Sequence, residues 1–140
     1  MYQAKGKTHV HQSTVYFGDT DAAGVVYYGT YLRFLEMGRI HYLQAMKYPY
    51  NKIREDGFGL VPIHVDLHYY SPLRFEDDFT IHTAISDLSR ASIKMTQQIN
   101  LNDKKICSAT IKLACCDEIK FKAIKLPITL IDKLKSFESN

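Results

Sequence analysis

The chain has no tryptophan, only three cysteines and four prolines, and no long hydrophobic run. A bilayer-spanning helix needs about 20 apolar residues, and the first residues, MYQAKGKTHVHQS, have the composition of neither a signal peptide nor a transit peptide. Cys107 stands alone while Cys115 and Cys116 are adjacent, which fits neither a disulfide framework nor a C-x-x-C zinc site. We therefore expect reduced, buried cysteines, no membrane span and a cytoplasmic protein.

The formal net charge of +3 is modest and unevenly placed. Residues 1–100 hold ten Lys and Arg against ten Asp and Glu, whereas residues 101–140 hold eight Lys against five acids. This basic excess lacks the Arg-rich, aromatic-interleaved stripe of a nucleic-acid-binding protein, so a solvated face is favoured and no nucleic-acid partner is expected. A phosphorylated small ligand stays open.

Length and patterning predict one domain over residues 1–140, because 46% hydrophobic residues suffice for one core and no repeat or linker interrupts the chain. Alternation predicts a strand over 9–17, and about five helical turns are predicted over 29–46. The apolar positions of this helix fall on more than one face. We expect a central helix that is covered on several sides.

The rest of the chain predicts a run of strands. A connecting segment with Gly57 and Gly59 precedes them, and a short amphipathic helix follows Pro127. The expected strands cover 60–70, 77–88, 92–102, 105–117 and 120–124. Their connections are too short for crossovers, so the pairing should be antiparallel. The predicted class is α+β, with a long central helix wrapped by a curved, mainly antiparallel sheet of five to six strands.

Two carboxylates lie in the connection before the predicted helix. Asp19 and Asp21 stand two residues apart, and the helix should begin near Tyr28 and Gly29. Asp commonly forms turns and caps helices, which is one interpretation of both residues. The other is chemical: free N–H groups and the positive end of a helix dipole stabilise developing negative charge, while a nearby carboxylate attacks a carbonyl or activates water.

A family resemblance favours the chemical interpretation. The segments FGDTDAAGVVYYGTYLRFLE, GRIHYL and VDLHYYSPLRFEDDFTI resemble the 4-hydroxybenzoyl-CoA thioesterase family of the hotdog superfamily, including its Tol-Pal-associated acyl-CoA thioesterase branch. The resemblance runs from about residue 13 to residue 117. It implies a hotdog fold, homodimers or homotetramers with joined sheets, and active sites at the subunit interface. It also implies hydrolysis of an acyl-CoA or aroyl-CoA without a further cofactor, since coenzyme A is part of the substrate.

The same resemblance assigns roles to residues by position. Asp21 matches the catalytic carboxylate, acting as nucleophile or general base, and Tyr28 matches the residue whose backbone N–H polarises the thioester carbonyl. Gly29, next to it, is assigned to substrate binding. Many Tol-Pal-branch enzymes have His where this chain has Tyr28, whereas the hydroxybenzoyl branch has Tyr, which leaves the acyl group open. Glu36, on the helix, ranks second as a catalytic carboxylate, with an interface ion pair as its alternative.

Arg90 and Ser92, near the turn in DLSRASIK, are the implied contacts to the phosphates of coenzyme A. Arg suits phosphate because its planar fork makes paired, charge-assisted hydrogen bonds. Asp19 is expected to fix its loop through local hydrogen bonds. The alternative function is a non-catalytic module that binds or senses acyl-CoA.

One further pattern resembles a metal site. In HVDLH, His64, Asp66 and His68 alternate along one predicted strand face. The two His Cα atoms are then roughly 13 Å apart, near the limit for sharing one ion. We favour a strand whose apolar face packs on the helix and whose polar face meets solvent or another subunit, with no metal bound. The same interpretation applies to His9 and His11.

Overall fold

The computed structural model describes all 140 residues. Its elements are, in chain order, β1 (His9–Thr14), η1 (Phe17–Asp19), α1 (Thr30–Ala45), α2 (Tyr50–Glu55), β2 (Phe58–Tyr69), β3 (Asp78–Leu88), β4 (Ser92–Leu101), β5 (Lys104–Asp117) and α3 (Ile128–Glu138). No helix is long and apolar enough to cross a membrane.

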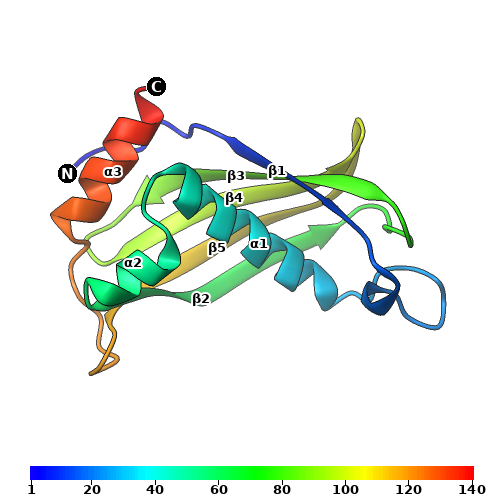
Figure 1. The fold of residues 1–140 in the computed structure, drawn as a ribbon, viewed down its shortest axis with the longest axis horizontal. Helices are drawn as coiled ribbons and strands as arrows, with labels where there is room; N and C mark the ends of the chain where they lie inside the picture. The colour runs from blue at the N-terminus through cyan, green and yellow to red at the C-terminus, as the bar shows by residue number, and fades with distance from the viewer.

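The five strands form one antiparallel sheet in the order β1-β3-β4-β5-β2, and α1 crosses its concave face (Figure 1). Tight turns join β3 to β4 and β4 to β5, as short connections require. β1 and β2 are the edge strands. The predicted α+β class, with a long helix against a curved antiparallel sheet, is confirmed.

α1 is buried on the face that packs against β1, β3 and β4. Its buried residues are Tyr31, Phe34, Leu35, Gly38, Tyr42 and Leu43. The helix ends where Lys47 takes a left-handed backbone conformation and the Tyr48 N–H donates to the Leu43 carbonyl at 3.0 Å. The expectation that α1 is covered on several sides is only partly right, because Leu32, which lines a cavity with Val65 of β2, is 46% exposed.

The apolar face of β2 also differs from the prediction. Val65 and Tyr69 point to the concave side, like their β5 partners Ile111 and Cys107, but they are 42% and 47% exposed. The expectation that α1 would cover this face is only partly right: the Tyr69 ring packs edge-to-face on Tyr31 of α1, but α1 packs mainly over β1, β3 and β4. In a single chain, much of the concave surface of β2 is therefore open.

Two local expectations are also corrected. Residues 120–124 form no strand: only Ala123 bridges to Cys116, because the chain turns back at Phe121, whose φ is +55°. The connecting segment before β2 contains the short helix α2, whose one buried residue is Ile53. A single buried position is too weak a periodicity to reveal a helix from sequence.

His9 and His11 do not face solvent as expected. The His11 ring stacks on His41 of α1 with ring centroids 3.6 Å apart, and His9 packs edge-on against Tyr42. Burial, with His41 adding to it, lowers the pKa of His9 and of His11. Both rings therefore belong to the contact between β1 and α1. The three cysteines are free and buried, as predicted.

Candidate active site

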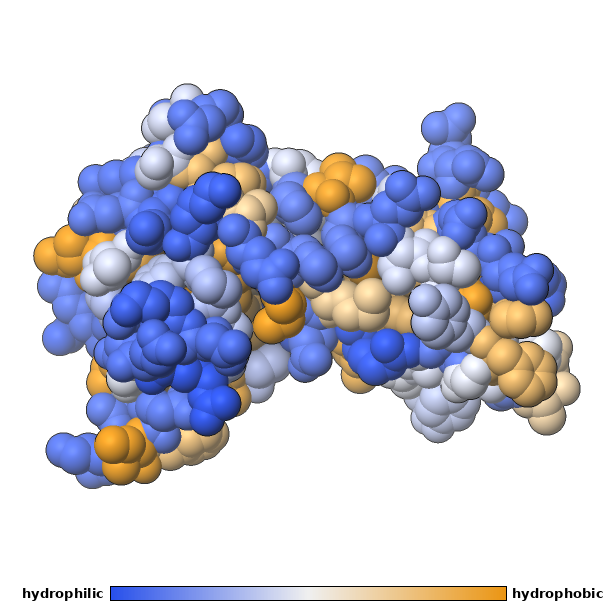
Figure 2. Space-filling view, in the orientation of Figure 1, coloured by the Kyte–Doolittle hydropathy of each residue, from blue (hydrophilic) through white to orange (hydrophobic).

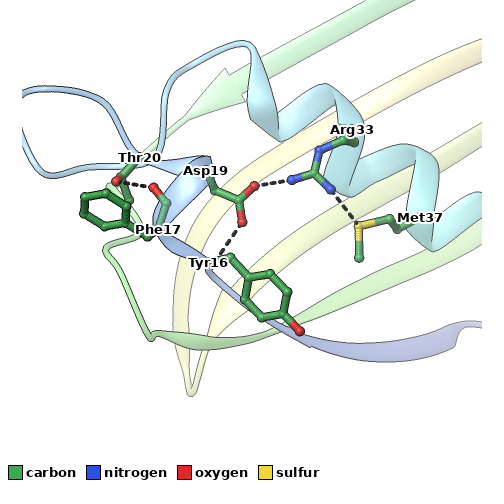
Figure 3. Close-up of polar contacts among 6 residues, drawn as sticks. All are labelled: Tyr16, Phe17, Asp19, Thr20, Arg33 and Met37. Atoms are coloured by element: carbon green, nitrogen blue, oxygen red, sulfur yellow. Dashed lines mark hydrogen bonds and ion pairs between the residues drawn. The ribbon is translucent and has the colours of Figure 1, made fainter.

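The loop between β1 and α1 is fixed by the Asp19 carboxylate. Asp19 is buried, and its Oδ2 accepts the Tyr16 N–H at 2.9 Å while its Oδ1 pairs with the Arg33 guanidinium of α1 (Figure 3). The Asp19 backbone carbonyl accepts the Tyr27 N–H at 3.0 Å. These bonds connect both ends of the loop to the helix, as the structural role expected for Asp19 requires.

Asp21 lies in the exposed turn of the same loop. Its Oδ1 accepts the Ala23 N–H at 2.9 Å and its carbonyl accepts the Gly24 N–H at 3.0 Å. Gly24 has φ +80°, a conformation that side chains rarely adopt. No protein donor reaches the Asp21 Oδ2. One carboxylate oxygen is therefore fixed by the turn while the other stays available.

The Asp21 carboxylate borders an open cavity of about 550 Å³. Its other lining residues are Phe17, Thr20, Ala22, Gly24 and Phe75. The Phe17 and Phe75 rings meet edge-to-face, 5.6 Å between centroids. The cavity thus presents one carboxylate beside an aromatic wall.

The start of α1 offers unpaired donors close to this loop. Neither the Tyr28 nor the Gly29 backbone N–H donates to an acceptor in the chain. The Tyr28 carbonyl accepts the Tyr69 hydroxyl at 2.8 Å, which fixes this peptide against β2. The neighbouring Tyr28 hydroxyl raises the pKa of Tyr27, and the Asp21 charge adds to that rise. The Asp21 charge therefore acts on the Tyr27 side chain, one residue before Tyr28.

Glu36 lies elsewhere. It is six residues into α1, roughly 9 Å along the axis from Thr30, is exposed, and has no hydrogen bond or ion pair. It borders two adjoining cavities of about 430 and 310 Å³ between α1 and the open β2–β5 face. Glu36 does not line the cavity at Asp21. The structure of one chain thus separates the two candidate carboxylates.

Arg39 is a candidate site residue that the sequence alone did not single out. It lines both cavities beside Glu36, and its Nη1 donates to the Gln97 side-chain oxygen at 3.2 Å. Gln97 in turn donates to the Leu35 carbonyl and to Thr83 Oγ1. Burial lowers the pKa of Arg39, and the charge of Glu36 opposes this effect. The spacing of Glu36 and Arg39, three residues apart on one helix face, was the available sequence signal.

Arg90 and Ser92 lie far from Asp21 within one chain. They are at the β3–β4 turn, where the Arg90 carbonyl accepts the Leu126 N–H at 2.8 Å. Asp21 follows β1, whose Thr14 pairs with Asp78 at the opposite end of β3. The 11 residues of β3 span roughly 35 Å. The implied phosphate-binding residues and the implied catalytic carboxylate therefore occupy opposite ends of the sheet (Figure 1).

His64, Asp66 and His68 of the HVDLH pattern lie on the convex face of β2. His68 Nε2 lies 3.0 Å from Asp66 Oδ1, and His64 is exposed beside them. Nowhere in the chain do three His, Cys, Asp or Glu side chains come together as metal ligands would. The pattern accordingly corresponds to a strand with a polar outer face.

Comparison with known proteins gives evidence for the family of this chain that does not depend on the geometry of the site. The family model described as "Thioesterase-like superfamily" matches residues 15–134. The acyl-CoA thioester hydrolase YbgC of Escherichia coli O6:H1 is 30% identical over 122 residues, covering 86% of this chain and 91% of that protein. The acyl-CoA thioesterase YbgC of Haemophilus influenzae is 32% identical over 116 residues, covering 81% and 84%. A crystal structure of a probable thioesterase from Bartonella henselae superposes with a TM-score of 0.83 at 30% identity, covering 86% of this chain and 100% of that chain.

Proposed function

We propose that this chain, which belongs to the thioesterase-like superfamily of hotdog proteins, is an acyl-CoA thioesterase that uses Asp21 and the N-terminus of α1. One observation supports the site above all others. The Asp21 Oδ2 has no protein donor, and the Tyr28 and Gly29 N–H groups, which follow in the same loop at the start of α1, have no protein acceptor. A thioester carbonyl placed between them meets an electron donor on one side and oxyanion donors on the other.

The reaction follows from these roles. The Tyr28 N–H, at the positive end of α1, bonds the thioester oxygen as it gains negative charge. Asp21 acts either as the nucleophile or as the base that takes a proton from the attacking water. The carbon–sulfur bond then breaks, and the coenzyme A thiolate leaves and takes up a proton. In total, one water is consumed and a free acid and coenzyme A are released.

The substrate needs more than one chain provides. β2 is an edge strand with an open concave surface, so its backbone is free to pair with β2 of a second copy. A two-fold antiparallel pair places the Arg90 end of one sheet beside the Asp21 end of the other. We assign Arg90 and Ser92 to the phosphates of coenzyme A in this homodimer, and Glu36 to the acyl groove. The free, buried cysteines suit a reducing cytoplasm.

The test is a panel of aliphatic and aromatic acyl-CoA thioesters, with released thiol followed for wild type and for Asp21→Asn and Asp21→Ala. We expect a loss of kcat of at least about 10²-fold in both variants, because acid–base catalysis alone supplies that much, with KM little changed. Asp103→Asn, in the exposed β4–β5 turn, is the matched control.

Three outcomes decide the proposal. Turnover that disappears only in the Asp21 variants supports it. Equal turnover in all proteins contradicts the role of Asp21, and Glu36→Gln is then the variant to assay next. Tight binding without turnover of any thioester would identify a binding or sensing module.

A further inference from the structure

A rigid turn follows β5 at the end of the sheet away from Asp21. The Asp117 Oδ1 accepts the N–H groups of Lys120 at 2.7 Å and Ile119 at 2.9 Å, which holds the pKa of Asp117 below its usual value. The Phe121 N–H donates to the Asp117 carbonyl, and the Asp117 N–H donates to the Lys122 carbonyl. The turn is therefore held by four hydrogen bonds of its own.

The turn exposes two apolar side chains that are not part of the core. Ile119 is 92% exposed and Phe121 is 70% exposed, and Phe121 has φ +55°, where a bulky residue is strained. Lys120 and Lys122 alternate with them, and neither ammonium group has a carboxylate partner. Figure 1 shows the turn projecting at the lower left, and Figure 2 shows hydrophobic atoms on that projection. Exposed apolar side chains in a fixed conformation mark a contact surface.

The position of the turn identifies what it contacts. The Glu118 N–H donates to the Gly57 carbonyl, and Asp117 pairs with Phe58, so the turn lies beside the start of β2. The end of β2 is Tyr69, whose hydroxyl donates to the Tyr28 carbonyl at the candidate active site. In an antiparallel pair of β2 edges, the start of one strand lies beside the end of the other. The turn of one copy therefore meets the Tyr28–Tyr69 end of its partner.

The two surfaces also match in chemistry. At the candidate active-site end, Tyr28 is 67% exposed and Tyr69 is 47% exposed, so both present part of their aromatic area to solvent. Apolar Ile119 and Phe121 suit that area. The intervening lysines bring positive charge to the site where a phosphorylated thioester enters.

We infer that the turn at residues 117–122 completes the active site of the second copy, with Ile119 and Phe121 covering the bound thioester against Tyr28 and Tyr69, and with Lys120 and Lys122 facing its phosphates. This inference rests on the proposed function and on pairing through β2. Each active site then consists of a carboxylate loop from one subunit and a cover from the other.

A complementation experiment tests this arrangement. The double variant Ile119→Ser/Phe121→Ser should keep its dimer and its unfolding midpoint but lose roughly tenfold or more in kcat/KM, mainly through KM. Mixed and refolded with Asp21→Ala, it should recover about a quarter of wild-type turnover, because half of the dimers are mixed and one site in each is intact. Ile128→Ser, at an equally exposed residue of α3, is the control and should keep full activity.

Other results of that experiment overturn the inference. Absence of recovery on mixing places the turn in its own subunit's site. Unchanged kinetics in the double variant remove it from the site altogether. Dissociation into monomers makes it an interface element only.

A structural readout keeps the inference separate from the proposed function. Phe121→Cys and Tyr69→Cys chains, mixed and treated with a short bis-maleimide, should form crosslinked dimers that neither variant forms alone, since the native cysteines are buried. Crosslinking without turnover by the wild-type protein would support the contact and contradict the thioesterase. Turnover without crosslinking would support the thioesterase and overturn the contact.

Discussion

The guanidinium of Arg33, on the first turn of α1, pairs with the buried carboxylate of Asp19 in the loop that precedes the helix (Figure 3). The same carboxylate accepts the Tyr16 N–H, so one side chain connects the end of β1, the loop and the helix. Asp21 is two residues away and makes no hydrogen bond or ion pair with the helix itself. The Asp19–Arg33 pair therefore fixes the position of Asp21 relative to the α1 N-terminus, although Asp21 takes no part in that pair.

Replacing Asp19 with Ala should lower both stability and turnover. The change leaves the Tyr16 N–H and the half-exposed Arg33 guanidinium without their acceptor, at a cost of about 1–2 kcal/mol. We expect kcat to fall while the fold is kept, because the loop loses its anchor and Asp21 loses its alignment. Urea unfolding and thiol-release kinetics measure the two effects. Glu55→Ala, in an exposed pair with Lys52, should change neither; equal effects at both positions would contradict the anchoring role.

Gly38→Ala should destabilise the protein although alanine favours helices. A Cβ at Gly38 would stand 2.5 Å from Ile81 Cγ2 and 2.8 Å from both the Gln97 amide nitrogen and Thr83 Oγ1. Overpacking of this kind costs about 1–3 kcal/mol, which exceeds the gain of about 1 kcal/mol in helix propensity. Thermal unfolding measures the change. Gly18→Ala has open space around it and is the control; an unchanged midpoint for Gly38→Ala would show that α1 can move off the sheet.

The contact between the chain ends should make stability fall at alkaline pH. The Tyr2 hydroxyl donates to Glu138 at 2.7 Å, and burial, followed by this bond and the Glu138 charge, raises the pKa of Tyr2 to about 12. The folded chain therefore keeps this proton to a higher pH than the unfolded chain, whose phenol ionises near 10. The contribution is complete below pH 10 and is lost as the pH rises through about 12.

Urea unfolding between pH 9 and 12 measures this dependence. The wild-type free energy of unfolding should decline more steeply than that of Tyr2→Phe. Burial also raises the pKa of Tyr42 and Tyr48. The wild type and Tyr2→Phe both keep those residues, so the difference between their two stability curves is due to Tyr2. Tyr16→Phe, at an exposed position, should follow the wild type. Parallel curves for wild type and Tyr2→Phe would contradict the assignment.

A charge on the open β2 face should convert a dimer into a monomer. Val65→Asp and Leu32→Asp change side chains that are already partly exposed in one chain, so the monomer should remain folded. In a β2-paired dimer the same positions would bury the new carboxylate, which is costly without a partner. Sedimentation velocity measures the assembly. Val10→Asp, half exposed on the other edge strand β1, is the control; dissociation caused only by Val10→Asp would move the interface to β1.

Much of the fold could be predicted because its signals are local. The helix from 30 to 45 has a long periodic pattern, and the four long strands have alternation bounded by turn residues. α2 escaped prediction because it has one buried side chain, and the expected strand at 120–124 failed because Asp117 accepts the next N–H groups and folds the chain back. The sequence also failed to predict which surfaces pack against each other, as for His11 and Val65. A two-residue period shows which residues share a strand face but not which element covers that face.

The sequence by itself determined most elements of this protein, the antiparallel pairing of the consecutive strands β3, β4 and β5 and the loop that carries Asp19 and Asp21, because these depend on residues near one another in the chain. Only the tertiary structure separated the roles of the two carboxylates, by burying Asp19 against Arg33 and leaving an Asp21 oxygen free. It also decided that Arg90 and Asp21 lie at opposite ends of the sheet. Such relationships depend on the direction and order of the strands across the whole molecule. No local sequence pattern encodes positions that far apart.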